Sequence, residues 1–164
     1  MMLRGKARLL PDDVNTDMHC SSKYDTAPKA VEELSNTMFE KLSRGFAQRV
    51  GKGDFIVAGE NFGANSSREE AIEIMQKRGI AALLAKSFFR LLYRNAINLG
   101  MPAIVCDTSS IKESDELEVD LRGGLVRNLS QKTTIPCDPF PDVVLELLRD
   151  GGIIAQIVKR KENG

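Results

Sequence analysis

Short apolar runs alternate with amphipathic helical patterns in the middle of the chain. Residues 55–59 and 80–85 are short and apolar, as strands buried on both faces are. Residues 66–79 carry apolar side chains at helical spacing, and residues 88–99 repeat that pattern before a third apolar run at 102–106. The order strand, helix, strand, helix, strand favours parallel pairing through right-handed crossovers. We therefore predict an α/β layer for this middle part.

The two ends of the chain have a different pattern. Residues 3–10 are typical of a strand, and residues 28–45 have apolar positions spaced for one or two helices. Residues 117–121 alternate strictly between apolar and polar, and Gly123-Gly124 supplies a turn before a second strand at 125–129. A last amphipathic helix follows this antiparallel hairpin. The whole pattern predicts a sheet with both parallel and antiparallel strands.

Composition narrows the class of protein. The 164 residues, 42% of them hydrophobic, fit one domain over 1–164 whose core needs neither disulfides nor a metal. Lys+Arg 23 balance Asp+Glu 23, so net charge draws the chain to neither nucleic acid nor an anionic membrane. Cys20, Cys106 and Cys137 are far apart and outside any Cys-x-x-Cys pair, so no metal is expected on this chain. Without an export signal or a run of about 20 apolar residues, we expect a cytoplasmic protein.

The candidate chemistry starts in a loop with two glycines between the run at 55–59 and the next helix. Backbone N–H donors and the positive end of the helix dipole converge there, which suits a carboxylate or phosphate. Arg68 adds a planar guanidinium that matches a carboxylate. Ser66 and Glu69 have capping-box spacing, so a helix cap explains the Ser66 hydroxyl about equally well. Neither a P-loop nor a G-x-G-x-x-G order is present, so no nucleotide is expected.

Two further groups of polar residues are candidates for a functional role. Residues 12–24 form a polar loop too long for a plain connection, and loops of this length are usually functional or mobile. Its His19 has no identifiable partner, and a surface role is the more frequent explanation. Arg90 and Arg94 are four residues apart, so they share a helix face and either present two guanidinium groups or form a solvated face.

Several short motifs occur in the chain in an order that is typical of one family. They are Asp13, Asn15-Thr16-Asp17, Lys23-Tyr24, Asn61-Phe62-Gly63, Ser66-Ser67-Arg68-Glu69, Ala85-Lys86-Ser87-Phe88, Tyr93-Arg94-Asn95-Ala96-Ile97-Asn98, Gly100 and Pro102. Together they resemble the small subunit of 3-isopropylmalate dehydratase and its homoaconitate relatives, in the aconitase superfamily. The resemblance covers nearly the whole chain.

This resemblance implies an α/β fold, namely the swivelling β/β/α three-layer domain that ends aconitase. It also implies a large partner subunit that holds a 4Fe-4S cluster, while this chain binds no cofactor and closes over a small carboxylic-acid substrate. The expected assembly is a heterodimer or a heterotetramer. The activity implied is that of a hydro-lyase, which neither subunit performs alone.

The resemblance also assigns roles to residues. Ser66 matches the serine that acts as an alkoxide base and removes the proton next to a carboxylate. Ser67 and Arg68 match neighbours that bind the substrate carboxylate. The remaining positions matched to substrate binding are Asp17, Lys23, Tyr24 and Thr26.

The sequence departs from the family pattern at a few positions that bear on the substrate. Ala64-Asn65 replaces a usual Cys-Gly or similar pair, Glu70 stands where His or Gln is usual, and Lys23 stands where Arg is usual. The first expectation is 3-isopropylmalate, in leucine biosynthesis, with 2,3-dimethylmalate or homoaconitate as alternatives. A non-catalytic carboxylate-binding module, in which Ser66 only caps a helix, is the alternative from another class.

Overall fold

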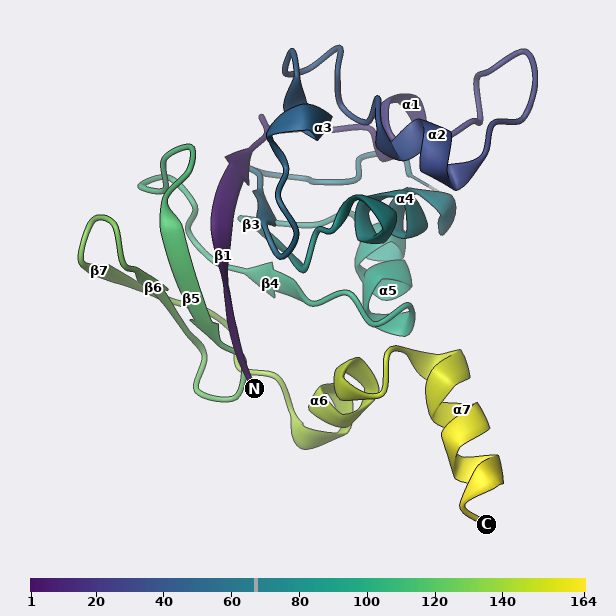
Figure 1. Cartoon of the computed structure of the whole chain (residues 1–164). Coiled ribbons are helices and arrows are strands. Elements are labelled where there is room, and N and C mark those ends of the chain that lie inside the picture. Colours follow the sequence, from purple (N-terminus) through teal and green to yellow (C-terminus); the bar gives the residue numbers. More distant parts are fainter. Residues whose placement is uncertain (67) are drawn as a thin grey trace.

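The computed structural model describes residues 1–66 and 68–164 (Figure 1). Its strands are β1 (Met2–Leu9), β2 (Phe55–Val57), β3 (Ala82–Ala85), β4 (Ala103–Val105), β5 (Glu116–Asp120), β6 (Leu125–Asn128) and β7 (Thr133–Pro136). Its helices are α1 (Thr16–His19), α2 (Val31–Ser35), α3 (Phe46–Arg49), α4 (Glu70–Arg78), α5 (Arg90–Asn98), α6 (Asp142–Arg149) and α7 (Ile153–Glu162). The strands of this part of the chain form one mixed sheet in the order β4-β3-β2-β1-β5-β6-β7.

The parallel half of the sheet confirms the α/β layer predicted for the middle of the chain. β2, β3 and β4 pair in parallel, with Phe55 opposite Ala82 and Leu83 opposite Ala103. Every residue of β2 and β3 is buried, which is why these strands read as continuous apolar runs rather than alternating ones. Helices α4 and α5 make the two crossovers.

Strand β1 joins the parallel half to the antiparallel half. It pairs in parallel with β2, where Ala7 lies opposite Phe55, and antiparallel with β5, where Met2 lies opposite Asp120. Gly5 lies where a Cβ atom would clash with the Gly53 carbonyl oxygen, so only glycine fits this crossing. The β5–β6 hairpin is confirmed, whereas β7 was not predicted, because only Ile135 of its four residues is buried.

Some helix boundaries differ from the predicted ones. Residues 28–45 contain only the short α2, and α3 begins just beyond them. α4 begins at Glu70, so the predicted start at Ser66 is wrong and the capping box is not formed. The C-terminal α7 has no buried residue and lies away from the sheet (Figure 1). No helix among the described residues is long and apolar enough to cross a membrane.

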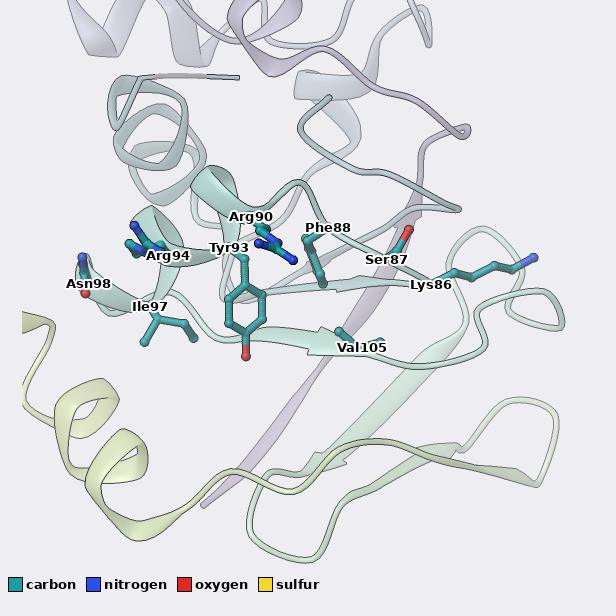
Figure 2. A pocket seen from close by; sticks show the side chains of 9 residues that line it. All are labelled: Lys86, Ser87, Phe88, Arg90, Tyr93, Arg94, Ile97, Asn98 and Val105. Carbon is teal, nitrogen blue, oxygen red and sulfur yellow. The ribbon is translucent and has the colours of Figure 1, made fainter. Parts of the chain in front are cut away.

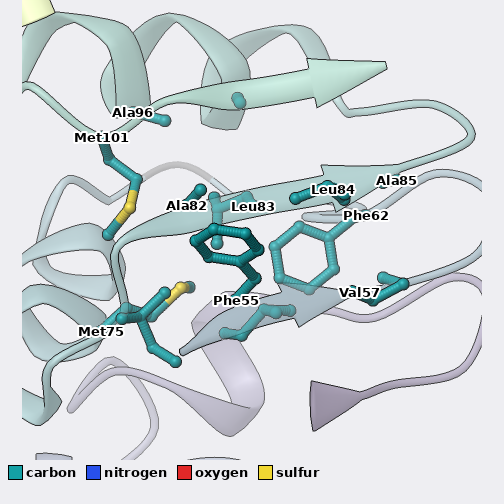
Figure 3. Packing of buried hydrophobic residues seen from close by; sticks show 14 of the residues in the cluster. Phe55, Val57, Phe62, Met75, Ala82, Leu83, Leu84, Ala85, Ala96 and Met101 are labelled. Atoms are coloured by element: carbon teal, nitrogen blue, oxygen red, sulfur yellow. The ribbon is translucent and has the colours of Figure 1, made fainter. Parts of the chain in front are cut away.

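The hydrophobic core holds the sheet and the Ser66 loop together (Figure 3). Phe55, Leu83 and Met75 are fully buried between β2, β3 and α4. Phe62, from the loop after β2, is also buried and stacks edge-on with Phe88 at a centroid distance of 6.1 Å. The loop that leads to Ser66 is therefore anchored in the core by an aromatic side chain.

Candidate active site

The candidate site lies at the edge of the sheet where the parallel strands end. β1, β2, β3 and β4 all run in the same direction, so the loops after them meet at one edge, as in other open α/β sheets that bind ligands there. The loops after β1 and β2 are joined by backbone hydrogen bonds, from Asp13 N–H to the Glu60 carbonyl (2.8 Å) and from Gly63 N–H to the Val14 carbonyl (2.9 Å). These bonds bring the polar 12–24 loop against Ser66.

Two residues set the backbone geometry just before Ser66. Gly63 has a φ of +86°, and a Cβ atom there would lie 2.6 Å from the Cβ of Leu92 on α5. Asn65 has a φ of 57°, in the left-handed region that Asn tolerates better than most residues. The substitution of the usual family residue by Asn65 therefore preserves the turn.

The Ser66 side chain is buried and does not cap a helix. It is 2% exposed, and its Oγ accepts a hydrogen bond from the backbone N–H of Thr16 (3.1 Å) and forms a second hydrogen bond with the Thr16 hydroxyl. The residue before α4 is Glu69, whose side chain makes no capping bond. Because the hydroxyl is not used by the helix, the structure contradicts the helix-cap explanation of Ser66.

Thr16 contacts Ser66 directly, although sequence reasoning assigned it no role beyond its place in the Asn15-Thr16-Asp17 motif. It is fully buried at the start of α1, whose N-terminus is capped by the Asn15 side chain accepting from Met18 N–H (3.1 Å). The available signal was Asn15 itself, since Asn followed by a polar turn is a common helix start. The short helix aims the Thr16 N–H at Ser66.

Asp17 and Lys23 form an ion pair beside Thr16. Asp17 is fully buried, and its Oδ2 lies 2.9 Å from Lys23 Nζ. The hydrogen bond to Asp17 raises the pKa of Lys23 above its ordinary value. Lys23 Nζ also lies 5.5 Å from the centroid of the Tyr24 ring, which is 64% exposed, and Thr26 is exposed further along the loop. Asp17 and Lys23 thus meet near Ser66, whereas Tyr24 and Thr26 face solvent.

Arg68 and Glu70 connect the start of α4 to the same loop. Arg68 is exposed, and its Nη1 lies 3.5 Å from Glu70 Oε2. Ser22 donates from its hydroxyl to Glu70 Oε1 (2.8 Å) and from its N–H to Oε2 (3.3 Å). Glu70 therefore points toward Arg68 and ties it to the 21–26 loop. Ser67 lies outside the described residues.

The side chains of His19 and Cys20 contact other parts of the chain than Ser66. His19 lines a separate cavity with Lys41, and burial, together with the Lys41 charge, lowers its pKa. The Cys20 thiol is buried against the Ala71 carbonyl at 3.5 Å, and burial raises its pKa far above the ordinary value. Burial likewise raises the pKa of Cys106 to about 12. Cys106 and Cys137 lie opposite each other in an isolated antiparallel bridge. Among residues 1–66 and 68–164, no three His, Cys, Asp or Glu side chains group as metal ligands.

A cavity of about 560 Å³ lies beside this site, and Arg90 and Arg94 both line it (Figure 2). The shared helix face predicted for these two arginines is therefore present on α5. Phe88, Tyr93, Ile97 and Val105 provide the apolar part of the lining.

Comparison with known proteins agrees with this architecture. The family model of the aconitase C-terminal domain matches residues 14–108. The chain is 42% identical over 159 residues to the 3-isopropylmalate dehydratase small subunit 2 of Archaeoglobus fulgidus, covering 97% of this chain and 96% of that protein. It is 39% identical over 163 residues to the methanogen homoaconitase small subunit of Methanothermobacter thermautotrophicus, covering 99% and 95%.

A solved structure shows the same fold over nearly the whole length. The crystal structure of 3-isopropylmalate dehydratase from Methanocaldococcus jannaschii matches with a TM-score of 0.88 at 38% identity, covering 98% of this chain and 96% of that one. The mixed α/β fold and the family resemblance inferred from the sequence motifs are both confirmed. The chain therefore belongs to the aconitase C-terminal, or swivel, domain family, among the small subunits of the 3-isopropylmalate dehydratase and homoaconitase type.

Proposed function

We propose that this chain is the small subunit of an iron–sulfur hydro-lyase that dehydrates and rehydrates a substituted malate, with Ser66 as the base. The observation that carries the proposal is the position of the buried Ser66 hydroxyl. It does not cap α4, and it is hydrogen-bonded to Thr16 at the strand-end edge of the sheet. The Thr16 N–H stabilises negative charge on Ser66 Oγ, because a hydrogen bond to the charged form of a group favours that form. Arg68, two residues further along the chain, adds a positive charge that it shares with Glu70.

In this proposal Ser66 acts as an alkoxide, and its Oγ takes the proton from the substrate carbon next to a carboxylate and becomes a neutral hydroxyl. The electron pair of that C–H bond forms the C=C bond while the hydroxyl leaves the adjacent carbon. The 4Fe-4S cluster expected on the large subunit would supply a Lewis acid for the departing hydroxyl. Arg68, together with Ser67, would hold the carboxylate, since a guanidinium binds it through two parallel N–H donors.

The loop chemistry favours a substituted malate over a tricarboxylate. Lys23 is paired with Asp17, so the two charges largely balance and offer little extra attraction for a third carboxylate. Tyr24 presents an exposed ring next to that pair, a surface that suits an aliphatic substituent. We therefore rank 3-isopropylmalate first, and with it a role in leucine biosynthesis. 2,3-Dimethylmalate ranks second and homoaconitate third.

Turnover of a substrate panel by the assembled enzyme tests this ranking. The chain would be combined anaerobically with the large subunit from the same organism, and C=C formation followed with the three acids. We expect kcat/KM for the best substituted malate to exceed that for homoaconitate by at least about 10-fold, the discrimination that one small apolar group provides. Preference for homoaconitate would contradict the ranking.

The same experiment separates an enzyme from a binding module. If no acid is turned over, and the isolated chain binds one of them tightly in calorimetry, the chain is a non-catalytic carboxylate-binding module. A half-site, by contrast, should bind substrate weakly until the large subunit is present.

We predict a moderate decrease in KM when the charge of Glu70 is removed. Glu70→Gln keeps an oxygen acceptor for Ser22 but removes the negative charge that competes with the substrate carboxylate for Arg68. An exposed ion pair is worth up to about 1 kcal/mol, so we expect KM to fall by up to about 5-fold with kcat nearly unchanged, as measured by steady-state kinetics. Ser22→Ala is the matched control, because it loosens the loop and leaves the Arg68–Glu70 pair in place. An increase in KM on Glu70→Gln would show that Glu70 aids substrate binding instead.

A further inference from the structure

The cavity lined by Arg90 and Arg94 is structurally continuous with the Ser66 loop. The Phe62 N–H donates to the Ser87 carbonyl (3.0 Å), and the Phe89 N–H donates to the Phe62 carbonyl (2.9 Å). The Asn61 N–H donates to Ser87 Oγ (2.7 Å). Residues 61–66 and 87–89 therefore form one unit at the strand-end edge. Anything that covers Ser66 from that edge approaches this cavity as well.

The lining of the cavity combines apolar surface with positive charge. Phe88, Tyr93 and Val105 are half-buried, and the lining contains no carboxylate. Burial, together with the charge of nearby Asp138, raises the pKa of Tyr93, so its hydroxyl stays a neutral hydrogen-bond donor. The result is an apolar floor with polar groups at its rim.

The arginines at this rim lack internal partners. In the part of the chain that the structure describes, neither Arg90 nor Arg94 is in an ion pair. Lys86 differs, because hydrogen bonds from Ser109 and, to a smaller extent, the charge of Lys86 lower the pKa of Asp107. The first turn of α5 contains no acidic side chain. The cavity beside α7 is different, because Lys159 there pairs with Asp150 at 2.6 Å. Two uncompensated guanidinium groups beside an apolar floor are complementary to an acidic surface.

The shape of this region fits a protein better than a small molecule. A small ligand is usually 70–90% buried in its pocket, whereas the arginines that would enclose it are exposed. Phe89 and Leu91, next to the cavity on the chain, are 37% and 36% exposed and extend the apolar surface beyond it. Arginine and aromatic side chains are also the residues enriched in protein interfaces.

We infer that the cavity and its rim (Lys86, Phe88, Phe89, Arg90, Leu91, Tyr93, Arg94) form a docking surface for an acidic segment of the large subunit. The inference rests on the proposed function, since the subunit that closes over Ser66 must approach from the same edge. Arg90 and Arg94 bind its carboxylates, and an apolar side chain of that segment occupies the cavity over Phe88 and Tyr93.

Charge reversal tests this docking surface. The variant carrying Arg90→Glu and Arg94→Glu, and the unchanged chain, would be titrated with the purified large subunit from the same organism, at about 0.05 M and 0.5 M KCl. We expect the Kd of the variant to be at least about 10-fold higher at low salt, with a smaller dependence on salt. Excess large subunit should restore most of the lost turnover by mass action.

Arg44→Glu is the matched control, because Arg44 is an exposed arginine outside the lining of the cavity. Circular dichroism and the Tm of each variant check that it folds. An equal Kd for the double variant and the control overturns the docking surface while leaving the proposed function intact. If the unchanged chain forms no complex with the large subunit, the proposed function fails and the inference with it. A small carboxylate that binds the isolated chain tightly and is lost on charge reversal, with the subunit Kd unchanged, would identify a small-molecule site instead.

Discussion

Ser66→Ala is expected to lower turnover of the assembled enzyme by about 10³-fold, within the range that a single positioned acid or base contributes. The change removes the only atom proposed to take the substrate proton, while the backbone that positions it stays in place. Steady-state rates at saturating large subunit, measured with the best acid of the substrate panel, provide the number. The Kd between the subunits should stay the same, because the buried Ser66 side chain presents almost no surface to a partner.

The variant has a structural side effect that needs a control. Alanine leaves the buried Thr16 N–H without its acceptor, which costs about 1–3 kcal/mol of stability. Ser35→Ala removes another buried serine hydroxyl, one that donates to the Glu32 carbonyl on α2. A loss of stability with full activity is expected for Ser35→Ala. If Ser66→Ala also retained full turnover, another group would have to be the base.

The parallel half of the fold could be predicted because its signals are local. β2 and β3 are continuous apolar runs, and the helices that follow them, α4 and α5, have clear helical spacing. β7 gave no such signal, since it is an edge strand with mostly exposed residues and a proline at Pro136. The central place of β1 also could not be predicted, because its two partners lie about 50 and 110 residues away and only tertiary pairing selects them.

The candidate site was predicted in outline, and its internal contacts were not. Capping-box spacing at Ser66 and Glu69 favoured a helix start there, yet the tertiary bond to Thr16 competes for the Ser66 hydroxyl and the helix begins four residues later. The Ser22–Glu70–Arg68 connection was equally invisible, because it joins residues almost 50 positions apart. The motifs proposed residues for the site, and the fold determines which of them touch.

Arg68→Lys is the second change expected to have a large effect on activity. Lysine keeps the positive charge but replaces a planar fork of donors with a single ammonium group, so it cannot bind both carboxylate oxygens in parallel. One charge-assisted hydrogen bond is worth about 1.5–3 kcal/mol, so kcat/KM should fall by roughly 10- to 150-fold. Most of that loss should appear in KM, since the carboxylate is bound in the ground state and in the transition state alike.

Arg44→Lys makes the same chemical change at an exposed position with no assigned role and should leave kcat/KM unaltered. A nearly normal kcat/KM for Arg68→Lys would mean that charge alone suffices at this position and that Arg68 does not bind a carboxylate through two donors. A loss confined to kcat would be a different result, because it would assign Arg68 to stabilising charge that develops only during proton transfer to Ser66. The split between KM and kcat therefore decides whether the start of α4 holds the substrate or assists the base.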